Sequence, residues 1–167
     1  MQVFGLAPAT DEQPFDCLNL DFETRSKSRF KSRLMTTGEE VGVLVARGGV
    51  LRGGSLLVDT LGRLIEVVAA DEELLRVEDD PFALTRCAYH LGNRHVRIQI
   101  TAEYLQFRAD PVLAEMVRQL GVHPAAVVAA FEPEWGAYGG GHQHGHDATF
   151  PEDYALAQAA FASRSTG

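Results

Sequence analysis

The sequence predicts an α+β protein with two domains and a tail, and three observations lead to this class. Residues 17 to 70 contain short runs of alternating apolar and polar residues separated by glycines. Two later segments repeat apolar residues at helical spacing, and after Phe131 the chain becomes rich in glycine and histidine without periodicity. We therefore expect a β domain over residues 1–71, a mixed domain over 72–136 and a flexible, histidine-containing tail over 137–167.

The first domain is expected to be all-β, because "FKSRLM" and "VGVLVAR" alternate as half-buried strands do. Basic residues also recur here at strict two-residue spacing, which in an extended strand turns them all to one face. The stripe consists of Arg25, Lys27, Arg29, Lys31 and Arg33. It fits either a solvated strand face or a docking site for an acidic partner, and the sequence leaves both interpretations open.

The second domain opens with the strand "EELLRVE", followed by the helix "DPFALTRCAYHLG". Asp80 is the expected N-cap and Pro81 the first-turn residue. The apolar stripe of this helix is Leu84, Cys87, Ala88 and Leu91. Gly92 and Asn93 tolerate the left-handed conformation, so we expect them to end the helix.

The stretch "VRIQITAEYLQF" predicts two strands. Alternation turns one set of side chains toward the core and the other away from it: Val96, Ile98 and Ile100 inward, and His95, Arg97 and Gln99 outward.

A second helix follows in "DPVLAEMVRQLG", with Asp110 as cap, Pro111 in the first turn and Gly121 at the end. Its buried stripe is Leu113, Met116, Val117 and Leu120. The run "AAVVAAF" supplies a last strand. Strand, helix, strand, strand, helix, strand is the order of a ferredoxin-like domain, in which two helices cover one face of an antiparallel sheet.

Composition excludes several classes of function. Fifteen basic and 23 acidic residues give a net charge of −8, which repels a nucleic-acid backbone. No apolar run is long enough for a membrane helix, and the start lacks a secretory signal, so we expect a cytoplasmic protein. The two cysteines, Cys17 and Cys87, are far apart, which argues against a disulfide or a cysteine metal site.

The run "GGGHQHGHD" contains half of the six histidines, at positions 142, 144 and 146. On an extended or looped backbone, His142, His144 and His146 can converge on one Ni²⁺, Cu²⁺ or Zn²⁺ ion, whereas a helix would separate them. Gln143 and Gly145 interrupt the run and a further segment follows it, unlike a purification tag. The tail is therefore a candidate metal-binding arm.

The remaining histidines give weaker signals. His95 follows the first helix of the second domain as a surface residue, His90 fits a hydrogen-bonded structural role, and His123 precedes Pro124 in a turn. The sequence contains none of the common hydrolase or phosphate-loop motifs. Ligands on a mobile tail suit metal transport better than turnover, so we expect no enzyme.

Two stretches, "RCAYHLGNRHVRIQI" and "AFEPEWGAYGGGHQHGH", resemble the UreE family of urease accessory proteins, and "RSKSRFKSRL", "ARGGVLRGGSLL" and "AADEELLRV" resemble its first domain. The resemblance covers residues 13 to 147. It implies a cytoplasmic nickel metallochaperone, built as a homodimer with an N-terminal β domain often called peptide-binding and a ferredoxin-like metal-binding domain. The implied partners are the urease apoprotein and the other accessory proteins, including the accessory GTPase.

The resemblance also assigns the metal ligands. His95 matches the histidine of the family's "GNRH" element, which meets its symmetry mate across the dimer axis. His142, His144 or His146 would add donors, which gives one Ni²⁺ per dimer, with Zn²⁺ and Cu²⁺ as competitors. Ala109 and Pro111 stand where some relatives carry an auxiliary histidine site, so this chain should lack that site.

Two other functions remain as alternatives, a histidine-rich metal buffer without a delivery role and a metal-dependent hydrolase. The tail is short beside the tracts of some relatives, which favours delivery over storage. Because imidazole binds metal only when neutral, affinity should fall below pH of about 6.5, the ordinary pKa of histidine.

Overall fold

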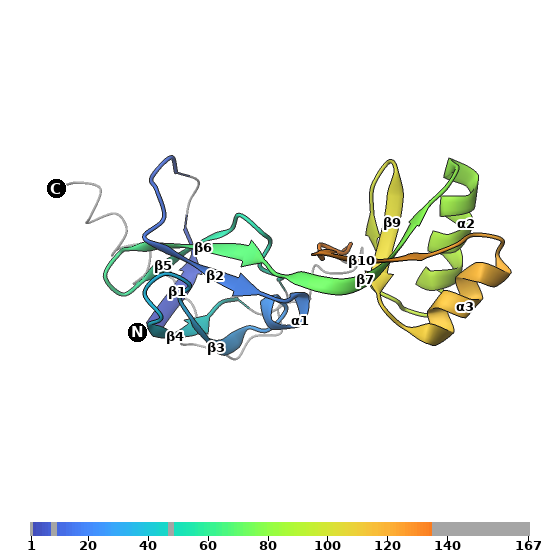
Figure 1. Ribbon diagram of the computed structural model, residues 1–167. Coiled ribbons are helices and arrows are strands. Elements are labelled where there is room, and N and C mark those ends of the chain that lie inside the picture. Colours follow the sequence, from blue (N-terminus) through green and yellow to red (C-terminus); the bar gives the residue numbers. More distant parts are fainter. Residues whose placement is uncertain (1, 8–9, 47–48, 135–167) are drawn as a thin grey trace. The chain divides into compact units, whose positions relative to one another are not determined.

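The computed structural model describes residues 2–7, 10–46 and 49–134 (Figure 1). The fold is α+β, with strands as the main element and few helices. The chain divides into two compact units, and within the described residues the first ends at Ala69 and the second begins at Ala70. The expected tail, with His142, His144 and His146, lies outside the described residues. None of the described helices is both long and apolar enough to cross a membrane.

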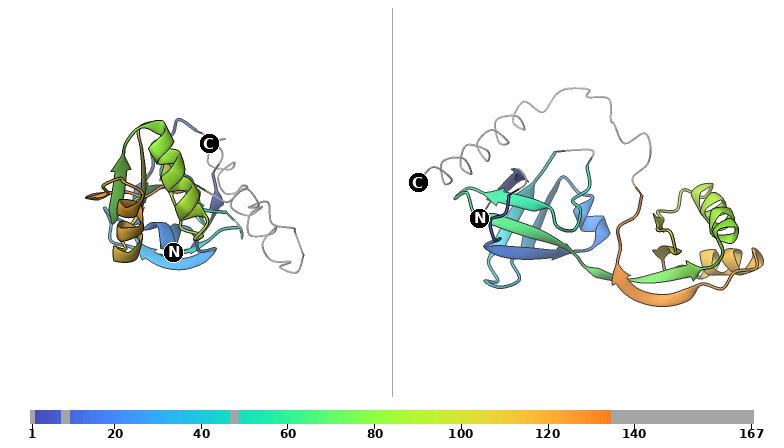
Figure 2. Two further views of the ribbon diagram at one scale, coloured as in Figure 1. Left: turned by 90° about the vertical axis from the view of Figure 1, so that its right-hand side faces the viewer. Right: turned by 90° about the horizontal axis from the view of Figure 1, so that it is seen from above.

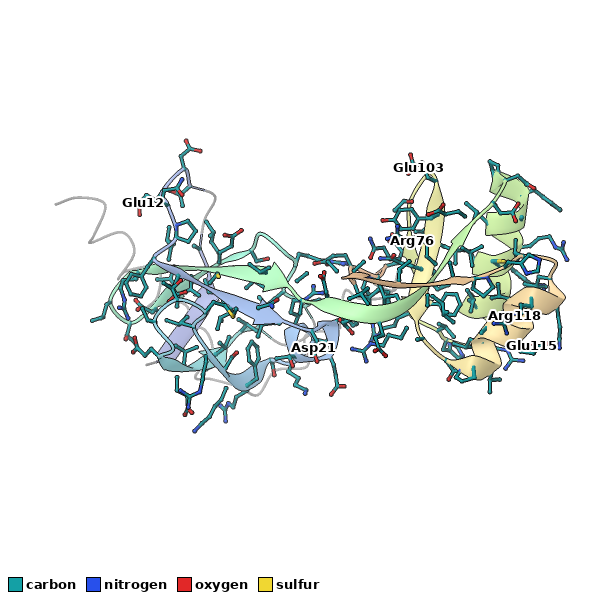
Figure 3. All side chains as sticks on the ribbon, viewed as in Figure 1. Glu12, Asp21, Arg76, Glu103, Glu115 and Arg118 are labelled. Atoms are coloured by element: carbon teal, nitrogen blue, oxygen red, sulfur yellow. The ribbon has the colours of Figure 1, made fainter. Side chains whose placement is uncertain are left out.

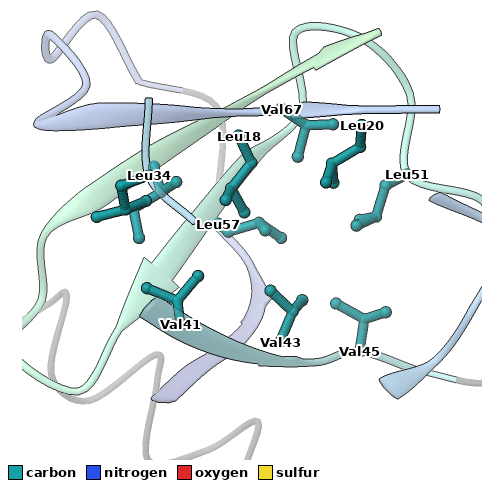
Figure 4. Close-up of a cluster of buried hydrophobic side chains, with 10 residues drawn as sticks. Leu18, Leu20, Leu34, Val41, Val43, Val45, Leu51, Leu57 and Val67 are labelled. Carbon is teal, nitrogen blue, oxygen red and sulfur yellow. The ribbon is translucent and has the colours of Figure 1, made fainter. Parts of the chain in front are cut away.

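The first unit is built on a mixed sheet whose strand order is β2-β6-β5-β1-β4-β3. The strands are β1 (Gln2–Leu6), β2 (Asp16–Leu20), β3 (Arg29–Arg33), β4 (Glu40–Leu44), β5 (Leu56–Asp59) and β6 (Leu64–Ala69). β1 pairs parallel with β4 and β2 with β6, while the other pairs are antiparallel. The core between them is aliphatic (Figure 4) and consists of Leu18, Leu20, Leu34, Val41, Val43, Val45, Leu51, Leu57, Ile65 and Val67.

The sequence predicts an all-β first unit, and this prediction is wrong in one place. A one-turn helix, α1 (Phe22–Arg25), follows β2. Asp21 caps it by accepting a 2.7 Å hydrogen bond from the backbone N–H of Thr24. Arg25 in this helix is fully buried, and its guanidinium donates to the carbonyl oxygens of Leu20 at 3.1 Å and Leu51 at 3.0 Å. A buried guanidinium needs such acceptors, and here it joins the end of β2 to the loop at Leu51.

The prediction of a five-residue basic stripe is therefore wrong for its first two residues, Arg25 and Lys27. Arg25 points into the interior, and Lys27 lies before the strand, where it pairs with Glu23 at 3.1 Å. The exposed basic residues of β3 itself are Arg29, Lys31 and Arg33. β3 is an edge strand, and charges on an edge strand oppose pairing with a foreign strand.

The second unit contains a four-stranded antiparallel sheet in the order β10-β7-β9-β8. Its elements are β7 (Asp71–Glu78), α2 (Pro81–Gly92), β8 (Gln99–Ile100), β9 (Tyr104–Arg108), α3 (Pro111–Gln119) and β10 (Ala125–Ala130) (Figure 2). Each helix begins as predicted. Asp80 accepts from the N–H groups of Phe82 and Ala83 at 2.8 and 3.1 Å, and Asp110 caps α3 in the same way.

The predicted apolar stripes of both helices pack in one core with one face of the sheet. Its buried residues are Val77, Cys87, Leu91, Ile98, Leu105, Phe107, Val117 and Val122. Leu84, Ala88, Leu113, Met116 and Leu120 lie half-buried against it. The spacing of apolar residues along each helix thus correctly predicts which helical side chains form the core of this unit.

Candidate metal centre

The end of α2 places His95 in an unusual backbone conformation. Its φ is +57°, and it is the one residue other than glycine with positive φ among those the structure describes. The N–H of Val96 donates to the carbonyl of Leu91 at 3.2 Å, and the N–H of His95 donates to that of Gly92 at 2.9 Å. These two bonds are the Schellman motif, whose left-handed position is usually glycine.

The prediction that Gly92 and Asn93 supply the left-handed ending is therefore wrong. Asn93 has φ −63°, in the right-handed region, and the helical path continues past it. The chain turns at His95 because Val96, the next residue, packs into the same core as Leu91. This apolar contact accompanies the Schellman motif and fixes where the turn falls.

The motif leaves the His95 side chain exposed. A left-handed residue other than glycine costs about 1–2 kcal/mol, and such residues cluster at functional sites. An exposed histidine in a position that glycine would fill without strain therefore marks a candidate site.

The predicted alternation of inward and outward side chains from His95 to Ile100 holds only in part. The strand here, β8, is two residues long and begins after His95. Ile98 is buried and Val96 half-buried as predicted, but Ile100 is 49% exposed. Gln99 was expected to face solvent or a partner, but its side chain is bonded within the unit to Gln106 and Glu132. The sequence reasoning missed these amides, since a glutamine in a strand carries no signal of its partners.

One imidazole does not make a tight metal site. Within residues 2–7, 10–46 and 49–134, no group of three or more His, Cys, Asp or Glu side chains is placed to hold a metal ion. His95 could thus hold a metal only with donors from elsewhere, such as a second copy of the chain or the tail. The structure does not bring His95 together with His142, His144 or His146, which lie outside the described residues.

The other two described histidines do not join His95. His90 is exposed on α2, and its ring meets that of Tyr89 edge-on with centroids 5.3 Å apart. In the described part of the chain its imidazole makes this aromatic contact instead of the predicted hydrogen bond. His123 is exposed before β10, as expected for a surface residue.

The thiols also lack the character of metal ligands. Cys17 and Cys87 are both free. Burial raises the pKa of Cys87, and burial together with the charges of Asp16 and Glu66 raises the pKa of Cys17. Because the thiolate is the form that binds metal, a raised pKa disfavours binding. The expectation that no cysteine binds the metal stays a prediction.

Comparison with known proteins places residues 4–158 in one family. Residues 4–70 match the family described as UreE urease accessory protein, N-terminal domain, and residues 65–158 match its C-terminal domain. Proteins named urease accessory protein UreE from Ralstonia nicotianae and Burkholderia vietnamiensis are 57% and 56% identical over 145 residues. The aligned region covers 86% of this chain and 68% and 72% of those relatives. This chain belongs to the UreE family of urease accessory proteins, which are accessory chaperones in urease maturation and not enzymes.

Proposed function

We propose that this protein is a nickel metallochaperone, which binds Ni²⁺ between two copies of the chain through His95 and hands it to the urease maturation complex. The observation that carries the proposal is His95 itself, exposed at the strained left-handed position of a helix terminus. Glycine would be the more stable residue at this position. Retaining histidine keeps a nickel-binding imidazole at the surface.

Two-fold symmetry would convert this single imidazole into a pair, because a residue near the axis meets its own copy. The same stretch of chain exposes two large apolar side chains, Tyr89 at 65% and Ile100 at 49%. Exposed aromatic and aliphatic residues of this kind are typical of surfaces covered by a partner. They support a homodimer whose interface contains His95.

The tail histidines complete the proposed coordination sphere. His142, His144 and His146 would add one or more donors to the His95 pair, with Zn²⁺ and Cu²⁺ as competitors for the same imidazoles. Delivery would then be ligand exchange, in which the tail leaves the ion for an acceptor protein. In this proposal residues 1–71 form the partner-binding β domain, residues 72–136 a ferredoxin-like metal-binding domain, and residues 137–167 a flexible tail.

The proposed partners follow from the family. Relatives of this chain are named urease accessory proteins, and we place this one in the cytoplasm with the urease apoprotein and the other accessory proteins, including the accessory GTPase. A soluble exchange of nickel between proteins needs no membrane or nucleic acid.

The test is nickel titration by calorimetry on the tag-free protein, with its mass in solution measured on the same sample. We expect one tight Ni²⁺ per two chains. His95→Ala should abolish this site, the combined His142→Ala, His144→Ala and His146→Ala variant should weaken it, and His123→Ala, an exposed control, should leave it unchanged. Unaltered stoichiometry and affinity in His95→Ala would refute the assignment.

A second measurement separates delivery from buffering. The nickel-loaded protein is added to apo-urease with the other accessory proteins, against the same amount of free nickel. A chaperone should activate urease beyond the free-ion control, and His95→Ala should lose that gain. A buffer would bind nickel equally well but only slow activation.

A further inference from the structure

β3 lies at one edge of the first unit's sheet, and β4 is its one neighbour among the described strands (Figure 1). Two backbone bonds that flank this pairing fix its hydrogen-bond pattern. The N–H of Val45 donates to the carbonyl oxygen of Ser28 at 2.9 Å, and the N–H of Leu34 donates to that of Glu39 at 3.0 Å. Opposite residues of an antiparallel pair are alternately bonded and non-bonded. Every second residue counted from Ser28 therefore bonds β4, and the residues between them do not.

The residues of β3 divide into two sets on this pattern. Phe30 and Ser32 are half-buried and bond β4 through their backbones, and Phe30 packs against the core. Arg29, Lys31 and Arg33 lie between and beside them with exposed side chains, and their N–H and C=O groups point to the free edge. The same three residues thus offer backbone hydrogen-bonding groups and positive charges to a partner.

The charge of this edge contrasts with the rest of the chain. β3 contains three basic residues and no acidic one, in a chain with 15 basic and 23 acidic residues. Glu40 of β4 lies 3.6 Å from Nζ of Lys31 and 3.8 Å from Nη2 of Arg33, so two cations share one carboxylate. Within the part of the chain that the structure describes, Arg29 makes no ion pair. Exposed pairs of this length contribute little to stability, which leaves the cations available to a partner's carboxylates.

The opposite edge of the sheet, β2, is already occupied by the chain's own groups. The N–H of Met35 donates to the carbonyl oxygen of Cys17 at 3.0 Å, and the buried guanidinium of Arg25 donates to that of Leu20 at 3.1 Å. Over the described residues β3 has no such cover until Met35, two positions after its end. It also contains no proline and no shift of register, which are common ways to block an edge.

We propose that the free edge of β3 is a docking site for an extended, acidic segment of a partner protein, which adds to the sheet as a strand. Backbone bonds would form to Arg29, Lys31 and Arg33. At about 3.4 Å per residue these positions span about 14 Å, and a carboxylate at every second residue of the segment would lie opposite each cation. The proposal rests on the proposed function, in which residues 1–71 bind a partner, and it is independent of the nickel ligands.

The alternative role of these cations is protection of the edge. Basic side chains on an edge strand oppose pairing with strands that bring no opposite charge. Protection alone would be served by charges of either sign, whereas β3 carries the sign that is in the minority in this chain. The charges that repel a neutral or basic strand also select an acidic one, so the sign favours an acidic partner.

The probe is a synthetic eight-residue peptide of alternating glutamate and valine, titrated by calorimetry into the full-length, metal-free protein. We expect it to bind, and a peptide with four glutamates followed by four valines to bind at least about fivefold more weakly, because alternation matches the cations. Lys31→Glu should weaken the alternating peptide by at least about fivefold. Arg118→Glu, the same change of charge at an exposed residue of α3 that lies 3.5 Å from Glu115 (Figure 3), should leave its affinity unchanged.

Amide hydrogen exchange separates strand addition from simple charge attraction. In the free protein the N–H groups of Phe30 and Ser32 should be protected, and those of Arg29, Lys31 and Arg33 should exchange freely. The alternating peptide should slow exchange of the second set by about tenfold or more and leave the first set unchanged. Lys31→Pro removes an outward N–H and retains the bonds to β4, so it should bind the peptide more weakly than Lys31→Gln, which removes the charge alone.

Three results overturn the docking site: no binding of the alternating peptide to the wild-type chain, equal binding by Lys31→Glu, or unchanged exchange at the three outward amides. Equal affinity for a glutamine–valine peptide would likewise show that charge is not recognised. His95→Ala should bind the peptide as the wild type does, so the metal site fails or holds separately. In the urease activation assay, Lys31→Glu should keep its nickel stoichiometry and lose part of the gain. An undiminished gain refutes the partner-binding role of residues 1–71 in delivery, and the peptide titration still reports on the edge itself.

Discussion

At the scale of single residues, the backbone conformation of His95 conflicts with its identity, because the left-handed position disfavours every residue but glycine while the proposed function needs an imidazole. Its left-handed backbone suits glycine, and the neighbouring Schellman bonds to Leu91 and Gly92 keep it there. Strain of this kind is retained where a side chain is needed for another purpose. The residue is thus expected to lower stability while it supplies the proposed nickel ligand.

Substitution at His95 should separate these two effects. His95→Gly should raise the free energy of unfolding by about 0.5–1 kcal/mol because it relieves the left-handed strain. His95→Asn should be nearly neutral, since asparagine tolerates this conformation, and His95→Ala should not gain stability. All three should lose the tight nickel site equally. Chemical denaturation of the apo protein gives the ranking, and a Gly variant less stable than Ala would contradict it.

At the scale of elements, one carboxylate ties the start of β2 to the turn between β3 and β4. Asp16 is 5% exposed and accepts the backbone N–H groups of Cys17 at 2.7 Å, Thr36 at 2.9 Å and Thr37 at 2.9 Å, and the Thr37 hydroxyl at 3.0 Å. Burial alone would raise the pKa of Asp16, but these donors together outweigh it and hold the pKa well below its usual range. The turn therefore depends on an ionised carboxylate.

Asp16→Asn should lower the free energy of unfolding at pH 7 by about 2–3 kcal/mol, because it removes the charge that four donors share. The folded-state pKa lies below the unfolded one, so the stabilisation is complete above the unfolded value of about 3.9 and is lost as pH falls toward the folded value. Denaturant unfolding from pH 7 to 2 should show the difference between wild type and variant shrinking with acid. Asp11→Asn, at an exposed position, should change stability by less than about 0.5 kcal/mol, and a gap that widens in acid would contradict the assignment.

At the scale of the whole molecule, the proposed nickel binding should be linked to stability. A ligand that binds the folded dimer and not the unfolded chain stabilises it by about 2.7 kcal/mol at 100 times its dissociation constant. Thermal unfolding of the proposed dimer should therefore shift upward with nickel and return when a chelator removes the ion. The shift should disappear between about pH 7.5 and pH 5.5 as imidazoles gain protons. An equal shift in His95→Ala would indicate that the ion binds elsewhere.

The sequence by itself determined the features that depend on neighbouring residues. Asp80 and Asp110 before prolines marked both helix starts, and the 3.6-residue spacing of apolar side chains marked their buried faces, because capping and helical periodicity act within a few residues. The motifs around His95 and the tail also carried the family, which comparison confirmed. The metal ligands and the homodimer remain proposals.

Only the tertiary structure decided where the chain departs from these local patterns. Arg25 left the basic stripe because carbonyls of Leu20 and Leu51, the latter 26 residues away, satisfy its buried guanidinium. His95 became the left-handed residue because Val96 packs into the core, and Gln99 turned inward because Gln106, seven residues on, presents an amide. Contacts made in the folded core settle a side chain's orientation, and the apolar and polar pattern of the sequence does not reveal them.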